Sequence, residues 1–557
     1  MDQVLSLVLT ELKTDADAVA VAADTLLRHK GLAAQLTIRQ RDMLVTAADD
    51  PRLRDLHEQR VRLHAAINAR QLAGPSDGAM QTHRQRLAAD RQRLDALESE
   101  IAQRSHGATH RLFELTWHDI AATLASDTAL VELRRRAVFD FHAADRTKEV
   151  HAGACYSALV LRPGAPPAFV DLGDAEHIDE LTGRVTALMS GRSQEEDTDK
   201  AARLRRAVLD PLLPALGGAS RLLLSPDGAL STLPYEALPL DDGRLVMDRW
   251  LVCYLPTGRD ALHLSQPSPA PGGPPLVLAD PDLKLGTPGG ANTRERAPFT
   301  PLPGAREEGR QIAEFLGVTP LAGADAVKER VTGAQSPAIL HIASHGFLSP
   351  SVPRAMDPAD FAVGDIVTPV DAHRQILVLD GTLATPMDFT LARDDPFERL
   401  SGRDVDDPML RCGVALAGAN TWLSGGDLPP EAGNGVLTAS DLALMDLSGT
   451  RLVVLSACDS ALGDTWVGEG VFGLRRAASI AGSRSLVMSL WKVPDRQTRD
   501  LMTDLYRRLW AGDGLAEALT GARQAMRRRY PHPAYWAAFV CQGDPGPVID
   551  TRYQEDG

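Results

Sequence analysis

The sequence LVVLSACDS, at residues 452–460, is an apolar run that stops at a cysteine. Earlier in the chain, residues 339–346 read ILHIASHG, a second apolar run that stops at a histidine and a glycine. Runs this short and apolar are typical of strands buried in a parallel sheet. Further runs of this kind lie at residues 129–133, 156–161, 221–224, 276–279 and 485–491. Because helical patterns separate them, they predict an α/β fold.

Two segments punctuate this pattern. Residues 265–275 are rich in proline and predict a linker. The linker separates a first α/β series, expected over residues 126–264, from a second series over residues 276–546, which a tail follows over residues 547–557. Within the second series, residues 349–436 are rich in Pro, Asp and Gly, and they predict an irregular insertion or mobile loop.

A helix is predicted near the end of the second series. Leucines recur at four-residue spacing within residues 495–510. Pro494 precedes this segment and Gly512 follows it, as is common at the two ends of a helix. The sequence therefore predicts a helix that begins at Asp495 and ends at Trp510.

The first 125 residues have a different, helical pattern. Apolar residues repeat every seven positions in two runs, at Leu56 and Leu63 and at Leu87, Leu94 and Ile101. Residues 73–78 contain Gly and Pro between the runs, so we expect an antiparallel helical hairpin. The hairpin either offers a docking or oligomerising surface or packs as a helical layer on its neighbour. Because no repeat of about 34 residues is evident, at most a remnant of a tetratricopeptide array is expected.

The composition is that of a globular protein in a reducing compartment. Hydrophobic residues make up 44% and charged residues 24% of the chain. No apolar run reaches the length of a membrane span, and the N-terminus lacks the pattern of a secretory signal, so we expect a cytoplasmic protein. The 5 cysteines are scattered and odd in number, which argues against a disulfide framework. Arginine far outnumbers lysine, which favours a bacterial source.

Nucleic acid, nucleotides and metals are not indicated as partners. The net charge of −15 argues against nucleic acid, and the arginines at residues 134–136 and 527–529 are interpreted as solvated helix faces. Residues 468–473 have the glycine spacing of a dinucleotide site, but no predicted strand directly precedes them. The metal-binding patterns HExxH and CxxC do not occur.

His345 and Cys458 stand at the ends of their predicted strands. Ligands bind beyond the carboxyl ends of parallel strands, so the two side chains meet if their strands are neighbours. Cysteine catalysis needs a thiolate beside an imidazolium that protonates the leaving amine. The backbone N–H groups of Gly346 and Cys458 would form the oxyanion hole. The alternative is a structural role, because a cysteine at a strand end is most often simply buried and spacing alone does not show proximity.

Several short motifs follow one another in order around these two residues. The histidine motif spans residues 341–346 and the cysteine motif spans residues 454–463. The others lie at residues 225–228, 233–239, 468–471, 481–487, 490–495 and 532–539. Together they resemble the CHAT family of caspase-related peptidases, which is also similar to separase, over residues 126–546.

The resemblance implies a caspase-like, parallel-sheet α/β/α sandwich for the second series. It assigns the catalytic dyad to His345 and Cys458, and it makes the first series a catalytically silent, caspase-like half. In the family, Glu-Thr commonly follows the cysteine, whereas Asp459 and Ser460 follow it here. Because an acid and a hydroxyl are kept, we expect the dyad to be retained and the substrate contacts to differ.

The resemblance also implies where the substrate is selected. Relatives that prefer Arg or Lys before the scissile bond place a carboxylate near the cysteine, but Ser456 stands two positions before it here. Asp495, which follows Trp491, resembles an acidic pocket residue of separase and would pair with a basic side chain. Alternatively, Asp495 caps the N-terminus of its own helix. Glu469 is a further acidic candidate, with a solvated loop charge as its alternative.

These observations predict a cysteine endopeptidase that acts on a protein or peptide substrate without a metal or organic cofactor. One alternative is a non-enzymatic scaffold that recruits partners through its N-terminal helices, which would also receive an activator of the enzyme. Another is a hydrolase or transferase that acts on a small amide with the same dyad. Relatives take part in bacterial defence and programmed cell death, and this pathway is an implication of the resemblance alone.

Overall fold

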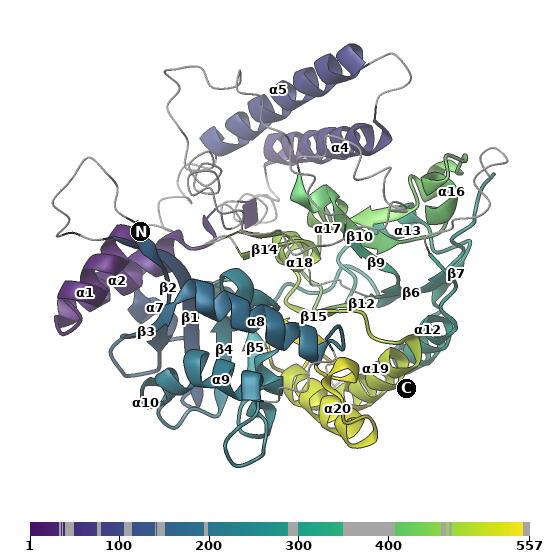
Figure 1. Cartoon of the computed structure of the whole chain (residues 1–557). Coiled ribbons are helices and arrows are strands. Elements are labelled where there is room, and N and C mark those ends of the chain that lie inside the picture. Colours follow the sequence, from purple (N-terminus) through teal and green to yellow (C-terminus); the bar gives the residue numbers. More distant parts are fainter. Residues whose placement is uncertain are drawn as a thin grey trace.

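The computed structural model describes residues 1–32, 35, 37, 38, 50–74, 80–104, 114–139, 141, 151–193, 199–287, 299–348, 407–457, 464–466 and 470–549. In this part of the chain, eleven strands form one large sheet, and helices cover both of its faces (Figure 1). The α/β fold predicted from the alternating sequence pattern is therefore confirmed.

The large sheet contains strands of both α/β series. From edge to edge the order is β3 (Ala168–Asp174), β2 (His151–Leu161), β1 (Thr128–Phe139), β4 (Arg221–Ser225), β5 (Leu251–Tyr254), β16 (Phe539–Gly543), β15 (Ser485–Ser489), β12 (Leu452–Ala457), β8 (Ile339–Ser344), β6 (Leu276–Pro281) and β7 (Leu321–Gly323). Strands β1, β4, β5 and β16 run parallel to one another, and so do β15, β12, β8, β6 and β7. The two groups meet at the antiparallel pair of β15 and β16. The carboxyl ends of one group of strands therefore lie on the opposite side of the sheet from those of the other group. Each of these two rows of strand ends is called a carboxyl edge.

The sequence located most of these strands. Every run predicted as a strand forms one, and the predicted helix has the expected bounds as α19 (Asp495–Trp510). The sequence analysis missed β3, β5, β7 and β16, and of these β16 joins the two groups of strands. Its apolar run, Phe539–Cys541, is short, and its pairing depends on β15 and β5, which come from distant parts of the chain. Tertiary contacts of this kind leave no local periodicity to detect.

Helices pack on both faces of the second group of strands. In Figure 1, α19 and α20 (Leu515–Arg529) lie below the strands, and α17 (Ala439–Ala443) and α18 (Leu474–Ala481) lie above them. The other helices are α1 (Asp2–Glu11), α2 (Ala16–His29), α4 (Pro51–Ala73), α5 (Met80–Arg104), α7 (Trp117–Ala121), α8 (Ala175–Met189), α9 (Asp199–Val208), α10 (Leu213–Leu216), α11 (Asp260–Ser265), α12 (Pro303–Leu316), α13 (Lys328–Thr332) and α16 (Ala419–Leu423). Among the described helices, none combines the length and the apolar composition that crossing a membrane requires.

Strand β1 also has helices on both faces, and its arginines alternate between them. Arg134 forms an ion pair with Asp2 on α1, at 3.0 Å. Arg135 points to the other face and forms an ion pair with Asp179 on α8, at 2.9 Å. The interpretation of residues 134–136 as a solvated helix face is therefore wrong. Because side chains alternate along a strand, neighbouring arginines meet acidic partners on opposite faces.

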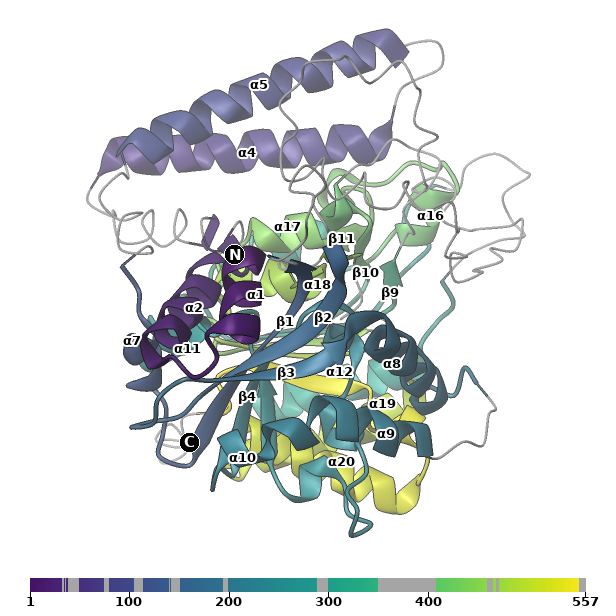
Figure 2. The same cartoon turned by 60° about the vertical axis from the view of Figure 1, so that its left-hand side comes forward.

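The predicted helical hairpin is present as α4 and α5, which lie side by side above the body of the molecule (Figure 2). Gly74 ends α4 with a positive φ of 66°, and residues 75–79 lie outside the described residues. Helix α4 contacts α17, because its Asn68 Nδ2 donates a hydrogen bond to Ser440 Oγ at 2.8 Å. Helix α1 packs instead on β1. The N-terminal helices therefore contact β1 in the first group and α17 beside the second group.

Lys30 follows α2 and is buried at the carboxyl ends of β4 and β5. Its Nζ forms an ion pair with Glu132 at 2.6 Å and donates a hydrogen bond to Ser225 Oγ at 2.9 Å. Glu132 also accepts hydrogen bonds from Ser225 Oγ and from the N–H of Gly258. Arg259 donates to the carbonyl oxygen of Lys30. The end of α2 therefore closes this edge of the sheet with a buried polar network.

A second, antiparallel sheet is formed by β9 (Gly346–Leu348), β10 (Cys412–Ala415) and β11 (Val436–Thr438). Residues 349–406 of the insertion expected at residues 349–436 lie outside the described residues. The expectation of irregular structure is wrong for residues 407–436, which contain β10 and α16. The apolar run of β10 is fully buried, but the Pro, Asp and Gly residues around it hide the pattern.

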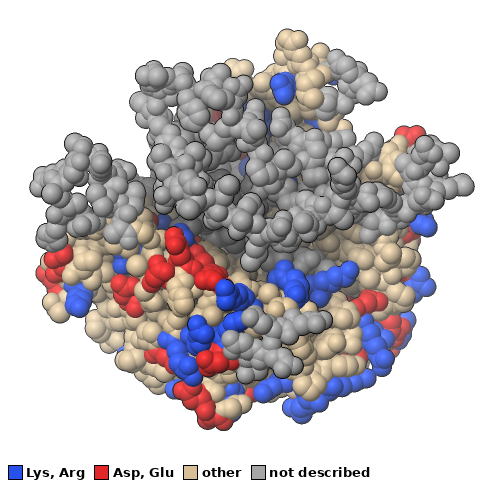
Figure 3. Space-filling model, viewed as in Figure 1, with Lys and Arg blue, Asp and Glu red and all other residues tan. Residues whose placement is uncertain are grey.

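Charges of both signs lie next to one another on the described part of the face shown in Figure 3. Exposed pairs along helices, such as Arg184 with Glu180 and Arg310 with Glu307, are also found on the molecule. Each exposed pair of this kind contributes at most about 1 kcal/mol to stability. These exposed pairs therefore contribute little to the stability of the fold.

Candidate active site

The candidate site lies where β8 and β12 end side by side. The two strands are parallel neighbours, and their register pairs Ser344 with Ala457. In the sequence, the residues that follow this pair are His345 and Cys458. Cys458 lies outside the described residues. The condition for the two side chains to meet, that the histidine strand and the cysteine strand are neighbours, is therefore met, and the dyad itself stays a prediction.

His345 is half-buried and is held by the segment before α12. Its Nε2 lies 2.6 Å from the carbonyl oxygen of Thr300. A carbonyl oxygen can only accept a hydrogen bond, so Nε2 must carry the proton. The ring of Phe299 packs against the imidazole, with the two ring centroids 5.3 Å apart. In the neutral ring, Nδ1 is therefore the nitrogen that can accept a proton.

The surroundings lower the pKa of His345 below its ordinary value of 6.5. Burial is the largest cause, and the positive charge of Lys492 acts in the same direction. The hydrogen bond to Thr300 and the negative charge of Asp495 raise the pKa, but by less. The neutral imidazole therefore predominates at pH 7, and this is the form that takes a proton from a thiol.

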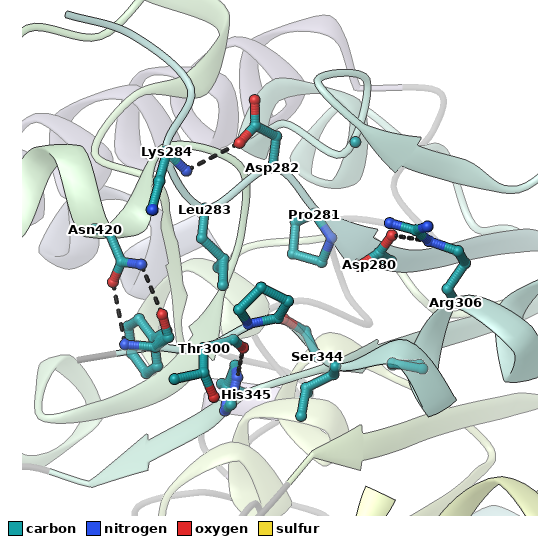
Figure 4. A pocket seen from close by; sticks show the side chains of 16 residues that line it. Asp280, Pro281, Asp282, Leu283, Lys284, Thr300, Arg306, Ser344, His345 and Asn420 are labelled. Carbon is teal, nitrogen blue, oxygen red and sulfur yellow. Dashed lines mark hydrogen bonds and ion pairs between the residues drawn. The ribbon is translucent and has the colours of Figure 1, made fainter. Parts of the chain in front are cut away.

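A cavity of about 310 Å³ lies beside His345 (Figure 4). Its walls come from the segment after β6, the segment before α12, and the ends of β8 and α16. On one side, Asp280 and Arg306 form an ion pair at 2.5 Å. On another side, Asn420 is hydrogen-bonded to the backbone of Phe299. The volume is at the lower end of the range for ligand pockets, roughly 300–1,000 Å³.

Asp495 begins α19 but caps a different helix. Its Oδ2 accepts a hydrogen bond of 2.5 Å from the N–H of Gly304, in the first turn of α12. No side-chain capping bond is formed at the N-terminus of α19 itself. A carboxylate is stabilised at a helix N-terminus by the free N–H groups and the helix dipole. Asp495 therefore links α19 to α12, and its predicted contact with a substrate stays a prediction.

The other residues predicted to bind the substrate differ in their surroundings. Trp491 is only 3% exposed, and its Nε1–H donates a hydrogen bond of 3.1 Å to the carbonyl oxygen of Ala534. Ser456 is 5% exposed, and its Oγ has no hydrogen-bond partner among the described residues. Glu469 lies outside the described residues. The structure therefore buries Trp491 and Ser456 close to the end of β12 and leaves their roles as predictions.

The N–H of Gly346 faces away from β10. The N–H of Ala415 donates to the carbonyl oxygen of His345, which marks these two residues as a hydrogen-bonded pair. Along an antiparallel ladder such pairs alternate with pairs that are not hydrogen-bonded, so the next pair, Gly346 and Val414, belongs to the second kind. The Gly346 N–H is therefore directed away from β10, as the predicted oxyanion hole requires.

His341 lies deeper on the same strand and is fully enclosed. Its Nε2 is 3.0 Å from Glu308 Oε1, and its Nδ1 is 3.1 Å from the Tyr506 hydroxyl. Both ring nitrogens are thus occupied, as expected for a histidine with a structural role inside the sheet. In the part of the chain that the structure describes, no cluster of three His, Cys, Asp or Glu side chains is placed to hold a metal ion.

Three of the four described cysteines have raised pKa values, and the fourth, Cys541, is only 1% exposed. Burial raises the pKa of Cys412 to about 12, and it is also the main cause of the raised pKa of Cys155. The hydrogen bond with Cys541, followed by burial, holds the pKa of Cys253 well above its ordinary value. A thiol reacts as the thiolate, so raised pKa values suppress reactivity. Among the cysteines, Cys458 is therefore the remaining candidate.

Two residues at the site were missed by the sequence analysis. Thr300 contributes only its backbone carbonyl, which any residue type offers, so no sequence signal exists for it. Asn420 lies within the segment expected to be irregular. The short apolar run at residues 412–417, followed by Gly418, is the signal that could have placed a strand and a helix start there.

Comparison with known families finds one matching family model. The model described as "CHAT domain" matches residues 198–544, which is more than half of the chain. The matched region contains β8, β12 and the cavity beside His345.

Two curated relatives share sequence with this chain. Tetratricopeptide repeat protein 28 of Mus musculus is 28% identical over 247 residues, which cover 44% of this chain and 9% of the relative. The protein of the same name from Homo sapiens is 25% identical over 336 residues, which cover 59% of this chain and 12% of the relative. The match therefore spans about a tenth of the length of these relatives.

Two solved structures have a similar arrangement at very low sequence identity. The Arg-specific cysteine proteinase gingipain R is 8% identical, with a TM-score of 0.32 and coverage of 68% of this chain and 76% of that chain. Separase of Saccharomyces cerevisiae, in its complex with securin, is 9% identical, with a TM-score of 0.32 and coverage of 88% and 27%. At TM-scores this low, neither likeness supports an inference about this chain.

Proposed function

This chain belongs to the CHAT domain family, and from that premise we propose that it is a cysteine endopeptidase with a dyad of Cys458 and His345. The observation that carries the proposal is the register of β8 and β12. Their last pair, Ser344 and Ala457, is followed in the sequence by the two residues of the dyad. If the register continues by one step, the two residues stand on neighbouring strands, whose backbones lie about 5 Å apart.

In the proposed reaction, Nδ1 of His345 takes the thiol proton of Cys458, and the thiolate attacks the scissile carbonyl carbon. The N–H groups of Gly346 and Cys458 hold the oxyanion of the tetrahedral intermediate. The intermediate collapses to a thioester, and Nδ1 returns the proton to the leaving amine. Water, deprotonated by Nδ1, then releases the acid and restores the thiol. The carbonyl of Thr300 stabilises the imidazolium through the Nε2–H bond.

We propose that the carboxylate of Asp495 favours a basic side chain at the substrate position before the scissile bond. Its negative charge raises the pKa of His345, so it acts within the site, and its Oδ2 is held by the N–H of Gly304. Ser456 and Glu469 are proposed as further contacts with the substrate. The buried Trp491 is proposed to support the part of the site that these residues form. Asp495→Asn should lower kcat/KM for peptides with Arg at this position more than for peptides with Leu. Equal loss for both peptides would reject the selectivity role.

The substrate is proposed to be a protein, and the α4–α5 hairpin to receive an activator. Among the residues of α5, only Asp90 and Ile101 are buried, so most of this helix is exposed to a partner. The same surface would serve a scaffold without catalytic activity. A cytoplasmic location and a bacterial defence or cell-death pathway belong to this proposal as implications of the family.

The test is cleavage of a mixed peptide library by the purified protein and by Cys458→Ala and His345→Ala, with products identified by mass spectrometry. Cleavage by the unmodified protein alone is the expected result. Cleavage that persists in both variants would reject the dyad. If no protein cleaves, reaction with an electrophilic peptide probe separates the alternatives. Labelling of Cys458 would support an enzyme that awaits an activator, and no labelling would support the scaffold.

A further inference from the structure

We infer that Asn420 is a positioning residue for His345, an inference that rests on the proposed dyad. Asn420 does not touch the imidazole. It acts through the backbone of Phe299 and Thr300, which lie 121 and 120 positions earlier in the chain. Through these two residues, Asn420 selects the tautomer of His345 and orients its ring.

The side-chain amide of Asn420 clamps Phe299 with two buried hydrogen bonds (Figure 4). Its Oδ1 accepts from the N–H of Phe299 at 3.1 Å, and its Nδ2 donates to the carbonyl oxygen of Phe299 at 2.8 Å. The partners fix the amide orientation, because an N–H must meet an acceptor and a carbonyl must meet a donor. Asn420 itself is 6% exposed, and its own N–H donates to the carbonyl of Leu283 at 2.9 Å.

The clamp reaches His345 in two ways. The ring of Phe299 packs on the imidazole, and the next carbonyl, that of Thr300, accepts the Nε2–H bond. A shift of Phe299 would therefore move both the surface on which the ring of His345 rests and the acceptor that fixes its proton. With Nε2 protonated, Nδ1 stays free as the base. Displacement of a catalytic group by about 1 Å can cost about 10²-fold in rate.

The clamp is tested by the variant Asn420→Ala, with Ser424→Ala as its matched control. Ser424 lies at the other end of the same helix, and within the described part of the chain its Oγ bonds only to the helix carbonyls of Asn420 and Thr421. Ring-¹⁵N labelling of histidine reports the tautomer, and His345→Gln identifies the His345 signals among the 15 histidines. The rate of peptide cleavage is measured against pH for the same proteins.

The unmodified protein and Ser424→Ala should show one His345 tautomer, with the proton on Nε2. Asn420→Ala should show a mixture, with kcat lowered about 10- to 100-fold and KM within about threefold. Asn420→Asp keeps only the bond accepted from the Phe299 N–H, so its tautomer mixture and its kcat should lie between those of the unmodified protein and those of Asn420→Ala. This variant replaces Asn420→Ala in the test if Asn420→Ala does not fold. An unchanged tautomer in the folded variants overturns the inference.

This test and the test of the proposed function can fail separately. If the unmodified protein cleaves peptides while Asn420→Ala keeps the tautomer, the positioning role falls and the peptidase stands. If the tautomer becomes mixed in Asn420→Ala but no protein cleaves or reacts with the peptide probe, the peptidase falls. The positioning of His345 then stands as a structural fact.

Discussion

The two groups of strands in the large sheet end differently at their carboxyl edges. At β4 and β5, Lys30 closes the edge, and both Lys30 and its partner Glu132 are only 1% exposed. At β8 and β12, His345 is half-buried beside a cavity of about 310 Å³. Among the described residues, the same kind of strand end is thus filled by Lys30 in one group and lies beside a cavity in the other.

The difference gives a physical basis for the predicted contrast between a silent half and a half with a candidate site. The antiparallel pairing of β15 with β16 turns the two groups in opposite directions, so the closed edge and the open edge do not compete for the same space. In the closed half, polar groups that could bind a ligand are satisfied by α2. In the open half, no described residue forms a hydrogen bond with Nδ1 of His345. We retain the domain boundaries at residues 265–275 as a proposal.

The largest expected effect comes from the open edge. Cys458→Ala and His345→Ala should each lower kcat/KM for a cleaved peptide by about 10⁴-fold or more, since nucleophile and base act as a unit. Cys155→Ala, on β2 of the closed half, is the control and should stay within about threefold. Steady-state hydrolysis of one fluorogenic peptide measures all three. A similar loss in all three variants would remove the contrast between the halves.

The next effect concerns the closed edge. Lys30→Met should destabilise the protein by about 3–5 kcal/mol, because it leaves the buried carboxylate of Glu132 without its ion-pair partner. The double variant Lys30→Met with Glu132→Leu should recover most of this loss, since it removes both charges. Thermal melting compares the three proteins at one pH. Melting of Lys30→Met at the temperature of the unmodified protein would show that the network does not hold this edge.

A smaller effect distinguishes two charges near the open edge. Asp495 raises the pKa of His345 and Lys492 lowers it. Asp495→Asn should therefore move the acidic limb of the pH–rate profile to lower pH, and Lys492→Gln should move it to higher pH. The profile of kcat/KM for a neutral peptide gives both shifts. Shifts in the same direction would mean that His345 is not the titrating group.

A further effect concerns α4, which contacts α17 beside the open edge. Burial, followed by the charge of Arg60, lowers the pKa of His57 to about 4 from its ordinary value of 6.5. The unfolded chain binds more protons between these two values, so stability is lost as the pH falls from about 6.5 towards 4. His57→Gln should melt like the unmodified protein at about pH 8 and should lose less stability at about pH 5. Parallel pH dependence of the two proteins would count against a buried, neutral His57.

Local sequence patterns were sufficient to predict much of the fold and the two strand ends at the candidate site. The strands ending at Ser344 and Ala457 are predictable because each is a short, apolar run stopped by polar residues. Helix α19 is predictable because Pro494 and Gly512 bound a regular leucine spacing. That the two strands are neighbours was a conditional expectation, because sequence spacing holds no information on which strands pair.

The rest depends on contacts between distant segments. The closure of one edge by Lys30 needs α2 to pack across β1, β4 and β5, and no local pattern records this. The role of Asp495 in capping α12 is also hidden, because its sequence position indicates only that it could cap α19. Thr300 acts through a carbonyl and Asn420 through backbone bonds, so neither residue type identifies its role.

The most direct measurement is the rate at which Cys458 is alkylated by iodoacetamide as a function of pH, with each cysteine quantified by mass spectrometry. In the unmodified protein, Cys458 should react at about pH 6–7 at least about 10²-fold faster than Cys155 or Cys412, whose pKa values are raised. His345→Ala should remove this advantage. A Cys458 that reacts no faster than Cys155, or that reacts equally fast without His345, would contradict the dyad.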